Sequence, residues 1–239
     1  MRIIECFGLP GSGKTTTIKN LKTNYHSINE TNFDLEVLIK DQGDTDLIYS
    51  QFLKSKGNLF KIASNLLFLL SNPSFSLSLL NLIRVLGFDK HLFGLSMTLI
   101  NQLKSVENSR SMSKNINKKI LVDEGLIQLM GSYAVNGNKI KKDYLTLFSR
   151  ILFNYAGIIY VDVPVETSLQ RLRSRANGKT RFDYMNDEVA LYNLKNVKGI
   201  FEKFIHHANI LNIPILVLDG KVGVNSKVEE IRLWLETIK

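Results

Sequence analysis

The chain has 239 residues, of which 44% are hydrophobic, and this predicts one globular domain over residues 1–239 with a substantial core. Its formal charge of +9, from 31 Lys and Arg against 22 Asp and Glu, favours anionic partners such as nucleotides, acidic sugars, nucleic acid or anionic lipid. The single cysteine, Cys6, excludes a disulfide within the chain and indicates a reducing compartment.

No uninterrupted apolar run approaches the roughly 20 residues that a membrane-spanning helix needs. The most apolar region, 59–100, is interrupted by polar and charged residues. The N-terminus does not follow the pattern of a secretory signal, because its apolar stretch is short and leads straight into a glycine-rich loop. We therefore expect a cytoplasmic protein, with peripheral contact at the inner face of the membrane as an alternative.

The first predicted element is a short, mostly apolar strand over 3–7. It leads into residues 8–15, which fit the phosphate-binding pattern G-x-x-x-x-G-K-[ST], and a helix is predicted over 14–23. The glycines let successive backbone N–H groups point inward and bind polyphosphate oxygens. Lys14 is expected to reach the terminal phosphates of ATP, and the Thr15 hydroxyl to bind Mg2+. The residues predicted to bind the donor here are Pro10, Gly11, Ser12, Gly13, Lys14 and Thr15.

A second strand is predicted over 33–39, followed by a carboxylate-rich loop at 41–46. A helical insertion is expected after it, over about 46–115, and breaks in the pattern of 58–103 indicate about three helices. Such a block commonly forms a lid or an acceptor-binding wall in enzymes that transfer phosphate. Core packing alone would also explain most of its apolar residues, and contact of one face with a membrane is a third interpretation.

The third predicted strand, over 119–125, carries acidic residues at its end. Asp123 follows an apolar run, which is typical of the carboxylate that holds magnesium beside the loop threonine. Glu124 is the candidate that orients a nucleophile and accepts its proton. Water as the nucleophile would make the chain an ATPase, and a substrate hydroxyl would make it a kinase. The simpler alternatives are a turn-forming Asp123 and a helix-capping or arginine-paired Glu124.

An arginine-bearing helix is predicted over 167–175. Arg171 and Arg175 are four residues apart, so on a helix they share one face and can together stabilise charge on a transferring phosphoryl group. Arg173 is expected to be solvated, and Arg181 to lie in a polar loop that could close over the site. The alternative is a basic surface helix without a ligand.

The remaining elements alternate between strands and helices, which predicts an α/β fold with a parallel sheet covered on both faces. Together with the phosphate-binding pattern at 8–15, this is the expectation of a three-layer P-loop NTPase fold with a five-stranded sheet. Ligands of such sheets bind outside the carboxyl ends of the strands. The loop at 8–15, the acids at 123–124 and the turn at 219–220 all lie at such ends. The further helices are predicted at 126–133, 141–153, 187–208 and 226–238, and the further strands at 157–163 and 214–218.

With these motifs the chain resembles the thymidylate kinase and deoxynucleoside kinase branch of the P-loop phosphotransferases. The segments that carry the resemblance are 7–16 at the front and 160–166, 169–171, Arg175, 181–183 and 217–220 at the back.

The resemblance implies further contacts with ATP. Thr16 would touch the phosphate nearest the nucleoside, and Asp219 and Gly220 would pass the adenine base. An arginine lid at about 167–186 would cover the phosphates, and by analogy with thymidylate kinases the chain could form a homodimer. The arginines of that lid are Arg171, Arg175 and Arg181.

The middle of the chain departs from the family. Thymidylate kinases have Asp-Arg after the third strand and nucleoside kinases have Glu-Arg, whereas this chain has Asp-Glu-Gly at 123–125. The missing arginine, which grips an acceptor phosphate in thymidylate kinases, argues against a nucleoside monophosphate acceptor. A hydroxyl acceptor such as a sugar, a nucleoside or a glycolipid head group fits better, and kinase-like proteins with a similar arrangement are often linked to surface-polysaccharide assembly.

The first hypothesis is therefore an enzyme that moves the γ-phosphate of Mg-ATP to a hydroxyl, or less readily to a phosphate, of a small-molecule, sugar or lipid-linked acceptor. The alternative is a nucleotide-dependent switch or ATPase whose helical block binds a partner or a membrane surface. A polynucleotide 5′-kinase would fit the basic charge, but we expect no nucleic-acid partner because no basic patch is interleaved with aromatic residues.

Overall fold

The computed structural model describes part of the chain, and its contacts divide the chain into two compact units. One unit comprises Arg2–Val37 and Asn117–Lys239, and the other comprises Met1 and Leu38–Ile116. The described residues are 2–25, 35–38, 66–71, 73, 76–77, 119–123, 125–135, 155–175 and 181–238.

The first unit is built on a sheet with the strand order β2-β3-β1-β4-β5. Parallel pairing with a defined register links four strands, because β1 pairs with both β3 and β4, and β4 pairs with β5. The predicted α/β fold with a parallel sheet is therefore confirmed, while the fifth strand, β2, takes the outer place beside β3. The strands are β1 (Arg2–Gly8), β2 (Leu35–Leu38), β3 (Lys119–Asp123), β4 (Tyr155–Asp162) and β5 (Ile215–Asp219).

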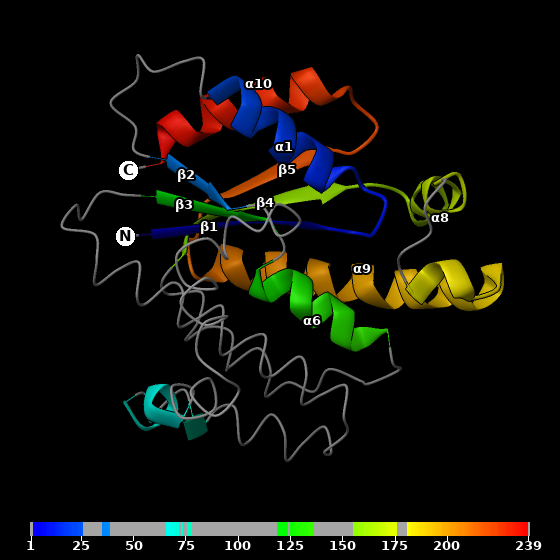
Figure 1. The fold of residues 1–239 in the computed structure, drawn as a ribbon, viewed down its shortest axis with the longest axis horizontal. Coiled ribbons are helices and arrows are strands. Elements are labelled where there is room, and N and C mark those ends of the chain that lie inside the picture. Colours follow the sequence, from blue (N-terminus) through cyan, green and yellow to red (C-terminus); the bar gives the residue numbers. More distant parts are fainter. Residues whose placement is uncertain are drawn as a thin grey trace, which may run out of the picture. The chain divides into compact units, whose positions relative to one another are not determined.

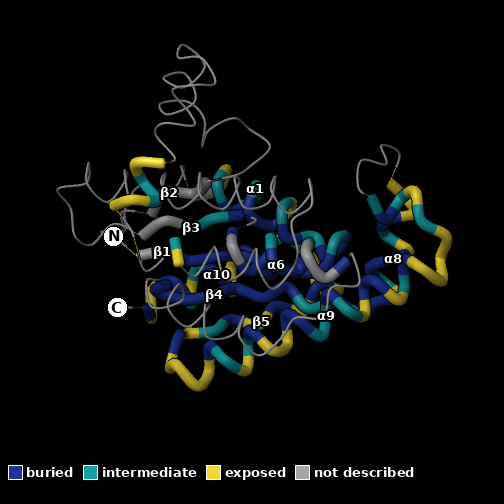
Figure 2. The backbone as a smooth tube through the Cα atoms, turned by 90° about the horizontal axis from the view of Figure 1, so that it is seen from below, coloured by how far each residue is buried: buried dark blue, intermediate teal, exposed yellow. Residues whose placement is uncertain are grey.

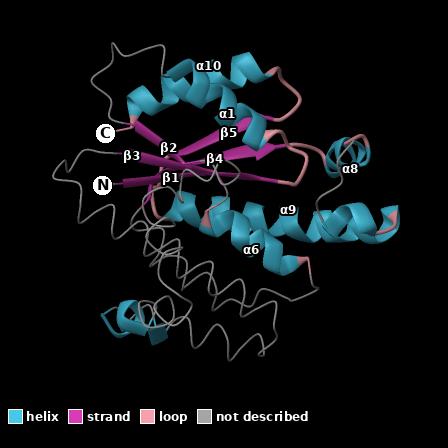
Figure 3. Ribbon diagram, viewed as in Figure 1, coloured by secondary structure: helices cyan, strands magenta, loops and turns pink. Residues whose placement is uncertain are grey.

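Helices cover both faces of this sheet (Figure 1). Helices α1 and α10 lie on one face and α6 and α9 on the other, as Figures 1 and 3 show in the same view. A strand between two helical layers is apolar along its length, which is why β4 is buried almost from end to end (Figure 2). The helices are α1 (Lys14–Tyr25), α6 (Leu126–Ala134), α8 (Val165–Arg173), the 3-10 turn η3 (Arg181–Tyr184), α9 (Asp187–Ile210) and α10 (Val224–Thr237).

An aromatic cluster holds α9 against the centre of the sheet. The ring of Phe7 on β1 lies 5.1 Å from Tyr160 on β4 and 5.1 Å from Phe201 on α9, measured between centroids. The Tyr160 hydroxyl donates to Asp162 Oδ1, which also accepts from Lys198 Nζ at 2.8 Å. Burial by itself would raise the pKa of Asp162, but these two hydrogen bonds outweigh burial and hold that pKa below its usual value. A polar link thus accompanies the apolar contact between α9 and the carboxyl end of β4.

In the other unit the structure describes 66–71, 73 and 76–77, and 66–71 are helical. Exposed leucines occur here, at Leu66, Leu67, Leu70 and Leu77. No described helix is long and apolar enough to cross a membrane. The helix predicted at 141–153 and most of the predicted insertion lie outside the described residues.

A pair of glycine substitutions tests the packing of α6 on α9. A Cβ on Gly131 would lie 2.5 Å from the Cε1 and Cζ atoms of Phe201, so Gly131→Ala should lower the free energy of unfolding by about 1–3 kcal/mol. Gly199 on α9 has nothing within 4 Å of its Cβ position, so Gly199→Ala should raise that free energy by about 0.5–1 kcal/mol. Urea denaturation of both variants measures the difference, and equal effects would contradict the close packing at Gly131.

Candidate functional site

The phosphate-binding loop begins at Gly8, where β1 ends, and closes at Lys14, where α1 begins. Gly11 and Gly13 have φ values of 86° and 89°, a left-handed backbone that favours glycine and lets the loop curl. Lys14 is only 7% exposed, so its long side chain runs along the protein rather than into solvent. The loop predicted from the sequence therefore has the backbone of a phosphate cradle.

The loop is packed too tightly for a side chain at Gly8 and at Gly11. A Cβ on Gly8 would lie 2.7 Å from the carbonyl oxygen of Val161 on β4, and a Cβ on Gly11 would lie 2.8 Å from that of Ser168 on α8. Ser12 is fully buried, and its Oγ has no hydrogen-bond partner among the described residues. Neighbouring elements thus fix the path of the loop from outside.

The predicted magnesium ligands lie at the same edge of the sheet. Asp123 ends β3, is 3% exposed and pairs in register with Cys6, two residues before the loop starts. A carboxylate and the Thr15 hydroxyl are the oxygen donors that Mg2+ prefers, so these residues fit the ion. Among the described residues no group of three or more His, Cys, Asp or Glu could hold a metal. Glu124 lies outside the described residues.

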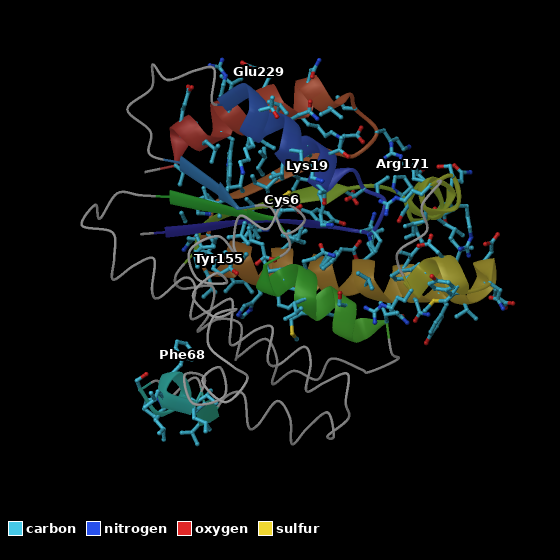
Figure 4. All side chains as sticks on the ribbon, viewed as in Figure 1. Cys6, Lys19, Phe68, Tyr155, Arg171 and Glu229 are labelled. Carbon is cyan, nitrogen blue, oxygen red and sulfur yellow. The ribbon has the colours of Figure 1, made fainter. Side chains whose placement is uncertain are left out.

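Helix α8 is fastened directly to the loop. The Ser168 hydroxyl donates to the carbonyl of Pro10. Arg171 Nη1 donates to the carbonyl of Gly220 at 2.9 Å, with longer contacts of 3.5 Å to the carbonyls of Gly11 and Ser12. Figure 4 labels Arg171 at this junction of α8 with the loop. Within the described part of the chain, the hydrogen bonds of this guanidinium all come from Nη1.

The other arginines differ from the sequence prediction. Helix α8 ends at Arg173, so Arg175 follows the helix and does not share a helical face with Arg171. Arg173 is exposed, as predicted, but its guanidinium also donates to the carbonyls of Phe182 and Met185 and forms a 2.9 Å ion pair with Asp187. Arg173 thus ties the end of α8 to η3 and the start of α9.

Arg181 is bound to α6 rather than to the phosphate-binding loop in this structure. Its Nη2 donates to the carbonyl of Ser132 at 2.6 Å, and burial lowers the pKa of its guanidinium. The segment 176–180 between it and α8 lies outside the described residues. The predicted contact of Arg181 with ATP phosphates therefore stays a prediction.

The turn after β5 reaches the phosphate-binding loop, as the sequence prediction requires. Gly220 donates its N–H to the carbonyl of Asp162 at 2.6 Å, and a Cβ on Gly220 would lie 3.3 Å from the carbonyl of Ser12. Asp219 is exposed and shapes the turn by accepting from the N–H of Lys221. Gly220 thus lies between the end of β4 and the loop.

Glu5 is a residue whose importance the sequence reasoning missed. It is fully buried, its Oε1 accepts from the N–H of Gln128 at 2.9 Å, and its Oε2 accepts from the Tyr155 hydroxyl at 2.7 Å. The side chain of Gln128 accepts in turn from the N–H of Gly8 at 3.1 Å. The signal in the sequence was a carboxylate inside an otherwise apolar strand.

Glu5 also accounts for the glycine at position 125. A Cβ on Gly125 would lie 2.5 Å from Glu5 Cδ, closer than real Cβ contacts come. A larger residue at 125 therefore requires the buried carboxylate to move. The start of α6 can approach β1 because Gly125 has no side chain.

Comparison with known proteins supports the fold. No protein-family model matches the chain. A search of curated proteins finds no match. Solved structures do match, among them the deoxyadenosine kinase from M. mycoides with bound dATP, at a TM-score of 0.52 and 16% sequence identity, covering 98% of this chain and 100% of that one. At this identity the likeness is one of fold, and the chain has the fold of a P-loop kinase.

The buried Glu5 network can be tested by Glu5→Gln. The new amide group cannot accept two hydrogen bonds as the carboxylate does, so a buried donor loses its partner and the free energy of unfolding should fall by about 1–3 kcal/mol. Glu202→Gln, at an exposed position of α9, is the matched control and should change it by less than about 0.5 kcal/mol. Equal stabilities of the two variants in urea denaturation would contradict the network.

Proposed function

We propose that the chain is a kinase that transfers the γ-phosphate of Mg-ATP to a hydroxyl group of an acceptor. The observation that carries this proposal is the convergence of three elements at the carboxyl edge of the sheet. The left-handed glycine loop, Arg171 from α8 and the Gly220 turn are joined there by hydrogen bonds. On a P-loop kinase fold this edge is where a nucleotide binds.

In this proposal the loop holds the donor. The N–H groups of residues 11–16 bind the phosphates, Lys14 reaches the outer ones, and Asp219 and Gly220 lie along the adenine. Thr15 and Asp123 would hold a magnesium ion, which would neutralise negative charge on the phosphates of the donor. Arg171, with Arg175 and Arg181 from the lid, adds positive charge where negative charge develops.

In the transfer step, Glu124 takes the proton of the acceptor hydroxyl. The acceptor oxygen forms a bond to the γ-phosphorus while the bond from that phosphorus to the bridging oxygen breaks and ADP leaves. The hydroxyl proton passes to the carboxylate of Glu124, which acts as general base. Atoms and charges balance with ADP, the phosphorylated acceptor and one proton as products.

The acceptor is proposed to offer a hydroxyl rather than a phosphate. Gly125 brings no cation to the end of β3, and the buried Glu5 carboxylate beside it would repel an acceptor phosphate. The matched structure is by name a deoxyadenosine kinase, so nucleosides stand among the candidates beside sugars and lipid-linked sugars.

The alternative, a nucleotide-dependent switch that binds a partner or a membrane surface, is favoured by the exposed leucines at 66–77. ATP hydrolysis that is insensitive to every acceptor, together with binding to vesicles of anionic lipid, would support the switch and overturn the kinase.

Donor binding is tested by a thermal-shift assay with Mg-ATP. At a ligand concentration of about 100 times Kd, binding adds about 2.7 kcal/mol to the free energy of unfolding, which raises Tm by several degrees. Lys14→Met should abolish the shift, whereas the control Lys195→Met, at an exposed position of α9, should keep it. A panel of nucleosides, nucleotides and sugars, added with Mg-ATP, then identifies the acceptor class.

The base is tested by Glu124→Gln, assayed with the acceptor found in that panel. Transfer should fall by about 10²–10⁴-fold because the proton has no acceptor, while the thermal shift with Mg-ATP stays as in the wild type. Glu166→Gln on the exposed side of α8 serves as the control and should keep full activity. Unchanged turnover of the Glu124 variant would remove this residue from the mechanism.

A further inference from the structure

Lys227, in the first turn of α10, is a buried lysine that no motif includes. It is 3% exposed, although lysines are almost never buried unless they are paired. It shares the buried face of the helix with Val228, Ile231 and Leu235. A lysine at a core position of an amphipathic helix is the signal by which the sequence could have revealed it.

The ammonium group of Lys227 lies against the phosphate-binding loop. Its Nζ is 3.6 Å from the position that a Cβ on Gly13 would occupy, and Gly13 directly precedes Lys14. Within the part of the chain that the structure describes, the ammonium makes no hydrogen bond or ion pair. The ammonium of a second buried lysine therefore lies close to the side-chain position of Gly13, although α10 is more than 200 residues further along the sequence.

Its electrostatic surroundings disfavour a positive charge in the absence of a ligand. Burial lowers the pKa of Lys227, the positive charge of Arg171 lowers it further, and the carboxylate of Asp219 opposes these effects in part. Cys6, the other ionisable group in range, is itself buried, which raises the pKa of its thiol and keeps it neutral. A negatively charged group bound in the loop would stabilise the positive charge of the ammonium.

We propose that Lys227 binds the polyphosphate of the donor nucleotide, as a second cation that acts beside Gly13 in addition to Lys14. The inference rests on the proposed function, since it requires a phosphate in the loop. Helix α10 would then contribute to the affinity for the donor nucleotide, a contribution that the sequence pattern of the loop does not predict. The group that Lys227 would bind is the polyphosphate chain, whichever base the nucleotide carries.

The test compares Lys227→Met and Lys227→Gln with a matched control, Lys221→Met, at an exposed position of the neighbouring turn. Isothermal titration with Mg-ATP and with magnesium tripolyphosphate gives Kd for each protein. Loss of a charged hydrogen bond should weaken binding of both ligands by about tenfold or more in the two Lys227 variants and leave the control unchanged. Thermal unfolding without ligand should show Tm equal to or above that of the wild type, because an unpaired buried charge has been removed.

The remaining outcomes would overturn either the role of Lys227 or the proposed function. Unchanged Kd in a folded Lys227 variant would overturn it, and so would a loss confined to ATP, because Lys227 would then contact the base or ribose. If neither variant folds under conditions where the wild type does, Lys227 stabilises the fold and the assignment fails. A wild-type protein that binds neither ligand would instead overturn the proposed function itself.

Discussion

The structure around the site depends on how closely backbone segments approach one another at the phosphate-binding loop. Three glycines make these approaches: Gly8 meets a carbonyl of β4, Gly11 meets one of α8, and Gly220 meets one at the end of β4. A Cβ at any of them would lie within 3.0 Å of a carbonyl oxygen. The loop is therefore held in a single path by neighbouring main chain, so its N–H groups are ordered before a ligand arrives and less entropy is lost on binding.

The two sides of the loop are supported by different chemistry. On the side of α8, the Ser168 hydroxyl binds the carbonyl of Pro10 in the loop, and the Arg171 guanidinium binds the carbonyl of Gly220 in the adjoining turn. On the side of α6, the buried carboxylate of Glu5 binds the start of that helix, and Gln128 passes the connection on to Gly8. A change at the start of α6 can thus reach the loop through two hydrogen bonds.

The local parts of this arrangement could be predicted from the sequence, because each is encoded by neighbouring residues. The loop, the acid at the end of β3 and the turn after β5 lie where the pattern of strands and glycines placed them. The orientation of Arg173 and Arg175 could not be predicted, since it depends on α8 ending at Arg173. Partners that are distant in the sequence could not be predicted either, and Glu5 is an example because it binds groups 123 and 150 residues away. Lys227 was missed for the same reason, because its neighbour Gly13 belongs to the opposite end of the chain.

The position of the single cysteine makes it a probe of local opening at β1. Cys6 is fully buried in β1, where it lies in register with Asp123 on β3. Burial raises the pKa of its thiol, so the folded molecule presents almost no thiolate to a reagent. Alkylation can then proceed only when β1 separates from its neighbours. The rate of thiol modification is a built-in measure of how often the strand beneath the loop opens, and of how far a bound ligand suppresses that opening.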